Sequence, residues 1–317
     1  MDTGGSGAGA RGALAAQALG TGSTHRPDRA RRAARRLLAA LAVAILLVVA
    51  GVSIAATVVT RPHRTAVGPP RLRNFESVSF TTVAGDTLRG WLALGQTGRG
   101  AIVLMHGIHS DRRSMTARAS VLARAGYGVL LFDFHAEGAS SGRRITFGAT
   151  EAADAAAAVA YLRLRAPGER IGAIGVSMGG AAALLGKVPL DVDALVLESV
   201  YPTIEAAVRD RLAAHAGPLG TVLTPLFLAQ LRPRFGIDPA ALRPIDHIAQ
   251  VRAPLLLLSG TADHDTHIEE ARALFARAHA PKTFWAVPGA GHEDLHAYDP
   301  SDYEQRVLAF FAATVSR

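Results

Sequence analysis

The chain has 317 residues, of which 49% are hydrophobic and 19% are charged, and it contains no Cys. This length suits one large α/β domain or two small ones, and so large a hydrophobic fraction excludes an intrinsically disordered chain. The lack of Cys excludes a disulfide scaffold, a thiolate metal site and a cysteine nucleophile.

The net charge of +8 belongs to the N-terminal part of the chain. Residues 1–73 carry a net charge of +9, whereas residues 74–317 carry −1. A nucleic-acid-binding protein carries its basic residues on the folded part, so no nucleic-acid partner is expected here.

The N-terminal segment divides into a basic tail and an apolar run. Residues 1–36 are rich in Gly, Ala and Arg without a core-forming period, and they are expected to form a disordered basic tail. Residues 37–60 contain no charge. A helix of that length spans about 36 Å, enough to cross a hydrocarbon core of about 30 Å. The run therefore predicts a transmembrane helix or signal anchor.

A cleaved signal peptide is the alternative, because Ser53-Ile54-Ala55 resembles a small-x-small cleavage site. The run is longer than the usual apolar region of about 7–15 residues in a signal peptide, which favours retention. Seven Arg precede Leu37 and fewer follow the run. The positive-inside rule then places the N-terminus in the cytoplasm and the large domain outside it, in a single-pass protein of the cell membrane.

The rest of the chain is expected to be a spacer followed by one α/β domain, residues 75–317. Residues 61–74 contain three Pro and no apolar period, which predicts a stiff spacer. Beyond them, short apolar runs alternate with helical patterns, which indicates a mostly parallel central sheet with helices on both faces. The strands are expected at Val78–Thr82, Thr87–Leu94, Ala101–Met105, Gly128–Phe132, Ile171–Val176, Ala194–Leu197, Leu255–Leu258 and Thr283–Val287, and the first two flank a hairpin turn at Gly85-Asp86.

An insertion interrupts this alternation between the strands that end at Leu197 and begin at Leu255. It holds helical patterns at 203–215 and 219–231 together with several Pro. We expect residues 201–246 to form a small helical cap over the carboxyl edge of the sheet, where α/β proteins place their sites. An ordinary crossover with a longer helix is the alternative.

The most informative motif is Gly175-Val176-Ser177-Met178-Gly179-Gly180, which follows an apolar strand and opens a helical run. Strand, sharp turn and helix in that order are what a nucleophile elbow needs. The alternative is a Gly-rich turn in which Ser177 only caps the helix.

Two further loops carry the groups that would activate a serine. Asp263 follows the strand LLLLSG, and His292 lies in a Gly-rich loop after the last strand. A serine becomes nucleophilic when a His accepts its proton, and that His is oriented by an acceptor such as Asp. A third loop, Leu104 to His109, also follows a strand and can offer a backbone N–H to an oxyanion.

These motifs, in the order Ser, Asp, His, resemble those of the α/β-hydrolase superfamily over residues 75–317. The chain looks most like bacterial membrane-anchored serine hydrolases of the esterase and acyl-peptidase-like group. The resemblance implies Ser177 as nucleophile, Asp263 as acid and His292 as base. It implies the backbone N–H groups of Ile108 and Met178 as the oxyanion hole, and neither a cofactor nor a metal.

Two stretches depart from the family pattern. In Asp133–Gly138, His135 and Glu137 replace the residues that the family's D-x-R-G-H-G turn would have. The acid loop, Asp263-His264-Asp265-Thr266-His267, lacks the usual Pro. Asp265 is therefore an alternative acid, and Glu198, at the end of another strand, is a more remote one.

Two other functions compete at the same residues. His292, Glu293 and His296 match the H-E-x-x-H pattern of zinc-dependent hydrolases, but His292 follows Pro288-Gly289-Ala290-Gly291 and so lies in a loop or at a helix start. A non-catalytic hydrolase-like binding protein would lack a triad member, and all three are present. The sequence thus predicts a serine hydrolase that cleaves a carboxylic ester, thioester or amide of a small-molecule or lipid acyl substrate.

Overall fold

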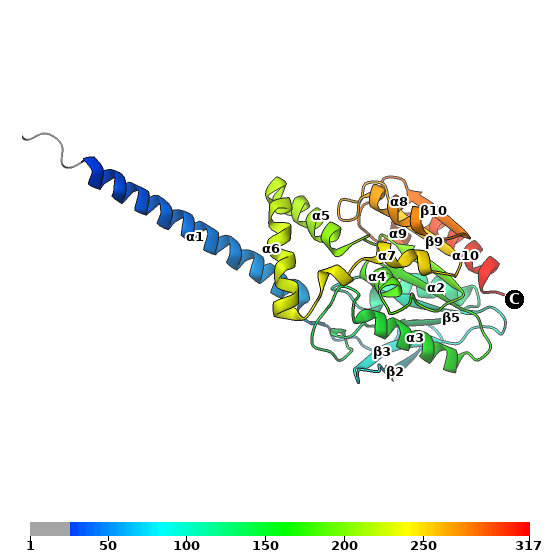
Figure 1. The fold of residues 1–317 in the computed structure, drawn as a ribbon. Coiled ribbons are helices and arrows are strands. Elements are labelled where there is room, and N and C mark those ends of the chain that lie inside the picture. The colour runs from blue at the N-terminus through cyan, green and yellow to red at the C-terminus, as the bar shows by residue number, and fades with distance from the viewer. Residues whose placement is uncertain (1–25) are drawn as a thin grey trace, which may run out of the picture. The chain divides into compact units, whose positions relative to one another are not determined.

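The computed structural model describes residues 26–317 (Figure 1). The chain divides into two compact units, of which the first ends at Gly51 and the second comprises Val52–Arg317. We call the second the larger unit. Of the expected disordered tail, residues 1–25 lie outside the described residues. Residues 26–36 form the start of helix α1 (Arg26–Thr60), contrary to the expectation of disorder. Ala and Arg have high helix propensity, so the helix of the apolar run continues backward until Pro27 in its first turn.

Helix α1 is long and apolar enough to cross a membrane, by its length and composition. Large apolar side chains are exposed along it from Leu37 to Val49. A helix that is apolar all round is typical of a membrane span rather than of the surface of a globular domain.

The C-terminal end of α1 belongs to the larger unit. Val52, Ala56 and Thr60 are buried there, and their four-residue spacing places them on one face of the helix. The hydroxyl of Ser53 donates a hydrogen bond to Oε1 of Gln230 at 2.8 Å. The last nine residues of the apolar run are therefore part of the folded domain.

The expected spacer, residues 61–74, lies against the domain instead of standing free. Strand β1 (His63–Arg64) pairs in parallel with β6 (Glu137–Gly138), and Val67 and Leu72 pack against the core. Proline residues lack N–H donors, but the residues between them keep theirs, and these find acceptors on the 136–138 backbone. The prediction of a stiff spacer is wrong for this reason.

The central sheet has eight strands in the order β10-β9-β8-β7-β4-β5-β3-β2. The six strands from β10 to β5 are parallel, and the β2–β3 hairpin adds an antiparallel edge, which confirms the predicted fold class. The strands are β2 (Glu76–Thr81), β3 (Thr87–Ala93), β4 (Ala101–Met105), β5 (Gly128–Phe132), β7 (Ile171–Val176), β8 (Ala194–Glu198), β9 (Leu255–Gly260) and β10 (Lys282–Val287).

Helices cover both faces of this sheet (Figure 1). Strand β4 shows why: all five of its residues are buried, with Val103 in the core of one face and Leu104 in the core of the other. One face packs against α3 (Glu151–Arg165), α4 (Met178–Leu184) and α8 (Ile268–Arg277). The other packs against α2 (Thr116–Arg124), α9 (Leu295–Tyr298) and α10 (Pro300–Thr314). Short 3-10 turns lie at Arg112–Met115, Pro239–Ala241 and Ile248–Gln250.

The insertion between β8 and β9 forms a helical hairpin. It consists of α5 (Ile204–Ala216), α6 (Pro218–Phe235) and the short α7 (Pro244–His247). Gly217, at φ 56°, ends α5 and turns the chain into α6. The two long helices pack together around Val208 and Leu231, in the same cluster as the end of α1.

Candidate active site

Ser177 stands at the sharp turn between β7 and α4. Its backbone has φ 49° and ψ −112°, a strained conformation for a residue with a side chain. The neighbouring glycines allow this turn to pack: a Cβ on Gly179 would lie 2.5 Å from the carbonyl oxygen of Met105, and one on Gly180 would lie 2.2 Å from Cγ2 of Val200. The motif thus folds as a nucleophile elbow requires.

His292 and Asp263 form a hydrogen-bonded pair. Nδ1 of His292, in the loop after β10, lies 2.8 Å from Oδ2 of Asp263, just after β9. Asp263 is buried, and its Oδ1 accepts hydrogen bonds from the backbone N–H groups of Asp265 and Thr266. A proton on Nδ1 leaves Nε2 as the free base of the ring.

The two alternative acids have other partners. Asp265 forms an ion pair with Arg211 of α5. Burial alone would raise the pKa of Asp265, but the hydrogen bond and charge of Arg211 outweigh it and lower that pKa. Glu198 is buried against the guanidinium of Arg118 at 2.7 Å and the hydroxyl of Tyr303. Neither carboxylate is hydrogen-bonded to the His292 ring.

Ile108 and Met178 line the same pocket as Ser177 and His292. Within the described residues, neither of their backbone N–H groups donates a hydrogen bond. A Cβ on Gly107 would lie 3.7 Å from Cβ of Ser177, so the loop at residues 106–111 passes directly beside the serine. Both N–H groups are thus available to a ligand next to the Ser177 side chain.

The pocket has a cavity volume of about 140 Å³. Its polar lining residues are Ser177, Arg211, Asp265, Thr266 and His292. The other walls are mainly apolar and come from α1, α5, α6 and two loops: Ala55, Val59, Phe147, Tyr201, Ile204, Ala207, Val208, Leu212 and Phe227.

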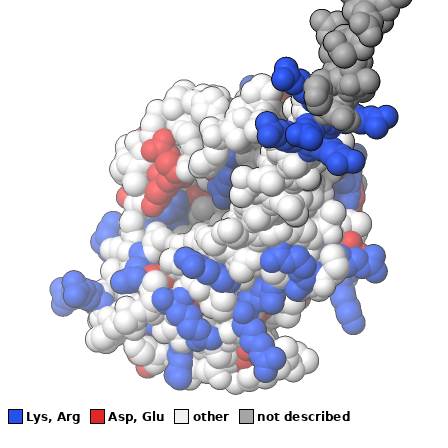
Figure 2. Space-filling view, turned by 90° about the vertical axis from the view of Figure 1, so that its left-hand side faces the viewer, with Lys and Arg blue, Asp and Glu red and all other residues white. Residues whose placement is uncertain are grey.

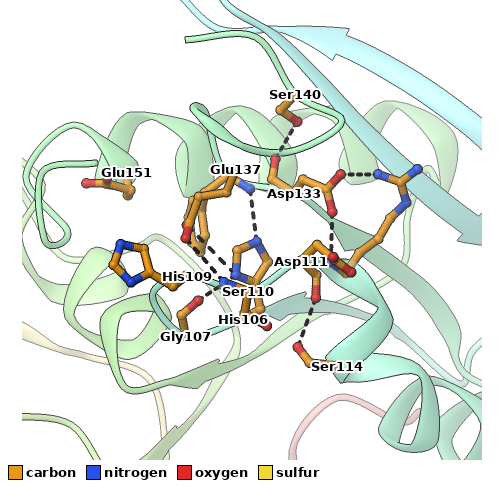
Figure 3. Close-up of polar contacts among 12 residues, drawn as sticks. His106, Gly107, His109, Ser110, Asp111, Ser114, Asp133, Glu137, Ser140 and Glu151 are labelled. Carbon is orange, nitrogen blue, oxygen red and sulfur yellow. Dashed lines mark hydrogen bonds and ion pairs between the residues drawn. The ribbon is translucent and has the colours of Figure 1, made fainter. Parts of the chain in front are cut away.

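Buried polar side chains hold the 106–111 loop from behind (Figure 3). The Nδ1–H of His106 donates to the carbonyl oxygen of Gly107 at 2.7 Å, and its Nε2 accepts the N–H of Phe134. Oε1 of Glu137 accepts the N–H of Ser110 at 3.4 Å. Burial is the main cause that raises the pKa of Glu137 to about 9, with the charge of Glu151 adding to it, so this side chain is neutral at pH 7.

The two positions that depart from the family pattern both belong to this buried layer. Glu137 is described above, and His135 is hydrogen-bonded to Asp154 at 2.6 Å. Burial lowers the pKa of His135, but Asp154 and Glu151 outweigh it and raise that pKa to about 9. Of the two, Glu137 supports the 106–111 loop, His135 contacts Asp154 instead, and neither residue lines the pocket.

The H-E-x-x-H pattern does not form one face of a helix. Helix α9 begins at Leu295, so His292 precedes it and His296 lies within it. The His296 ring pairs with Glu304 at 3.1 Å, whereas His292 pairs with Asp263. Among residues 26–317, no group of three or more His, Asp and Glu is arranged to hold a metal ion.

Comparison with known proteins gives three kinds of similarity. A family model described as serine aminopeptidase, S33, matches residues 96–242. The structure of the Pyrococcus furiosus esterase Pf2001 superimposes with a TM-score of 0.65 at 25% identity, covering 80% of this chain and 100% of that one. The Mycobacterium tuberculosis protein Rv2307c, described as uncharacterized, is 31% identical over 226 residues, which are 70% of this chain and 74% of that protein. The chain belongs to the α/β-hydrolase superfamily.

This α/β-hydrolase is also 36% identical over 146 residues to the thiohydrolase aneE of Aspergillus aculeatus, a match that covers 44% of this chain and 45% of that protein. In overall structure it resembles the Pyrococcus furiosus esterase.

Several pocket residues of the hydrolase were missed by the sequence analysis. Ala55 and Val59 line the pocket although they belong to the apolar run. The Nε2–H of His109 donates to the carbonyl oxygen of Val59 at 2.9 Å, so the end of α1 also borders the 106–111 loop. Ser53 and Thr57 interrupt the run at four-residue spacing, which was the available sign that one face of the helix is in contact with protein.

Proposed function

We propose that this hydrolase cleaves a carboxylic ester, thioester or amide through a covalent acyl-enzyme on Ser177. One observation carries the proposal: a His292 ring bonded to a buried Asp263 opens onto the same pocket as Ser177 and two free N–H groups. Four separate loops converge there, which a structural role for the Gly-rich turn does not require. The similarity to a thiohydrolase supports a thioester among these candidate substrates.

The chemistry follows from the positions of these groups. Oγ of Ser177 attacks the acyl carbonyl while Nε2 of His292 takes its proton, and the N–H groups of Ile108 and Met178 stabilise the oxyanion. His292 then gives the proton to the leaving alcohol, thiol or amine. Water, deprotonated by the same ring, attacks the acyl-enzyme and releases the carboxylic acid and the free serine. Asp263 keeps the ring oriented and stabilises its cation.

We further propose that α1 anchors the protein in the cell membrane, with the N-terminus in the cytoplasm and the larger unit outside it. The positive-inside asymmetry supports this orientation. Cleavage after Ala55 would remove Val52 from the core and Ala55 from the pocket wall. Retention of the segment is therefore the arrangement that leaves the domain intact.

The test of the mechanism is Ser177→Ala in the full chain. We expect loss of labelling by a fluorophosphonate probe and loss of turnover of short p-nitrophenyl esters, with an unchanged circular dichroism spectrum. Ser79→Ala, on the edge strand β2, is the matched control and should keep both activities. Full turnover by Ser177→Ala would eliminate the mechanism.

A further inference from the structure

The end of the apolar helix is a wall of the catalytic pocket. Ala55 and Val59 line the pocket together with Phe227 of α6, and all of these residues lie within the larger unit. An adjacent face of this helix end is apolar and exposed, since Ile54 and Val58 show 64% and 39% of their surface. The last turns of α1 thus carry pocket-lining side chains on one face and exposed apolar side chains on the next.

The length of the uncharged part of α1 limits how far its C-terminal end can lie from a bilayer. Once Val52–Thr60 is assigned to the larger unit, fifteen uncharged residues remain, from Leu37 to Gly51. They span about 22 Å, whereas a hydrocarbon core is about 30 Å thick. A span that starts at Leu37 must therefore continue into the segment that packs on the larger unit, so that this part of the unit reaches the membrane interface.

Helix α6 presents a second surface suited to the membrane interface. Leu219 and Val222 expose 58% and 72% of their side chains on neighbouring positions of one helix face. The helix contains no Asp or Glu, and its charges are confined to Arg232 and Arg234 near its C-terminus. Exposed apolar side chains with basic residues at one end are typical of helices that lie in a membrane interface.

Basic side chains surround the end of α1, and we call Arg61, Arg64, Arg144 and Arg234 the basic collar. Arg234 donates to the carbonyl oxygen of Ser53 and to the hydroxyl of Thr57. Arg144 and Arg234 both stack on Phe235, and Arg64 binds the backbone at Ser140 and Gly142.

Figure 2 looks onto the side of the larger unit where α6 lies and shows Lys and Arg mainly over its lower half, with a group of Asp and Glu at the upper left. The basic part of this face complements anionic lipid headgroups.

From these observations we propose that α6 and the end of α1 lie in the interface of an anionic bilayer, and that the pocket takes the acyl chain of a membrane lipid ester directly from that leaflet. The proposal rests on the function proposed above and names its substrate class. The acyl chain would lie along Val59, Val208 and Phe227, with its carbonyl at Ser177. The lipid headgroup, as the leaving alcohol, would stay on the side of the basic collar.

Val59→Trp tests the pocket wall. In the full chain reconstituted into vesicles, it should lower the ratio of kcat/KM for a palmitoyl ester over an acetyl ester by about tenfold or more, because the indole fills the acyl path. The matched control is Val58→Trp, one residue away on the exposed side of the same helix, and it should leave that ratio unchanged. Melting temperatures of both variants report on folding.

Val222→Trp tests the membrane contact independently of activity. The two native Trp residues, Trp91 and Trp285, are buried, so an exposed indole on α6 dominates any quenching. In vesicles of equal parts phosphatidylcholine and phosphatidylglycerol, brominated acyl chains should quench this indole and shift its emission to the blue. Val83→Trp, at the exposed tip of the β2–β3 hairpin, should show neither effect.

The outcomes separate the two proposals. If the fluorophosphonate does not label the wild-type protein, the serine mechanism is wrong. The quenching experiment still tests the membrane contact of α6, because it does not depend on activity. If labelling succeeds but the wild-type protein prefers acetyl esters, or Val59→Trp leaves the chain-length ratio unchanged, the lipid-substrate inference is overturned. Absence of quenching at position 222 overturns the interfacial position.

Discussion

Two carboxylates in one loop, Asp263 and Asp265, have different partners. Asp263 is bonded to His292, and Asp265 to Arg211. We expect Asp263→Asn to lower kcat by about 10⁴-fold, because the ring then loses the acceptor that sets its tautomer. Asp265→Asn should cost less than about tenfold, since it removes only a surface ion pair. Steady-state kinetics on a p-nitrophenyl ester compares them, and the reverse order would make Asp265 the acid.

The buried Glu137 makes stability depend on pH. Its pKa in the fold is about 9, against 4.5 for the free side chain. Between these values the unfolded chain releases the proton and the folded chain keeps it, so the free energy of unfolding falls as pH rises through this window. The Glu137→Gln variant cannot titrate at this position. As pH rises from about 5 to about 8, its melting temperature should therefore increase relative to that of the wild type.

The control for this prediction is to compare the wild type and Glu137→Gln at each pH. His135 and Asp154 titrate in both proteins, so their contribution cancels in the difference between the two melting curves. A constant offset at every pH would show that Glu137 is ionised in the folded protein. A difference in melting temperature that changes with pH therefore indicates a protonated Glu137, whereas a side chain that only fills space would give no such change.

Side-chain roles of this kind were only partly predictable from the sequence. Ser177 and His292 stood out because a nucleophile elbow and a Gly-rich loop after the last strand are local patterns. The sequence does not distinguish Asp263 from Asp265, because the direction of each carboxylate depends on its contacts in the fold. One such contact, Arg211, lies 54 residues before Asp265 in the chain. The sequence shows that His135 and Glu137 depart from the family pattern. What these side chains do is shown only by their buried contacts in the structure.

At the scale of elements, the strand–elbow–helix unit depends on close backbone approach. A Cβ on Gly179 would meet the carbonyl oxygens of Met105 and His106 at 2.5 and 2.7 Å, and backbone cannot move aside. Gly179→Ala should therefore destabilise the fold by about 1–3 kcal/mol. Gly68→Ala, where a Cβ meets nothing within 4 Å, is the control and should be neutral or slightly stabilising. Equal melting temperatures would show that the helix can shift without cost.

The strands were predictable because their signal is local: runs such as Ala101–Met105 are continuously apolar, as strands buried on both faces must be. The helical patterns at 203–215 and 219–231 also correspond to α5 and α6. Residues 61–74 were predicted wrongly, because Pro content reports backbone stiffness and not the acceptors at Ala136 and Gly138 that hold β1.

At the scale of the whole molecule, the lack of Cys makes the topology directly measurable. Single Cys residues introduced as Ser6→Cys and Val83→Cys have no competing thiols. In intact cells, a membrane-impermeant maleimide should label the second variant and not the first, because the N-terminus is proposed to be cytoplasmic. Disruption of the cells should make both reactive, and labelling of Ser6→Cys in intact cells would reverse the orientation.

The backbone contacts between the helix end and the active-site loops bear on proteolytic shedding. His109 is bonded to the carbonyl oxygen of Val59, and β1 pairs with β6 beneath the loop that carries Ile108. A protease that cut the chain before Ala66 would free an ectodomain without these supports and without one side of its acyl pocket. With α1 as the proposed anchor, release by such a cut would also inactivate this hydrolase, and its activity would stay confined to the membrane-bound form.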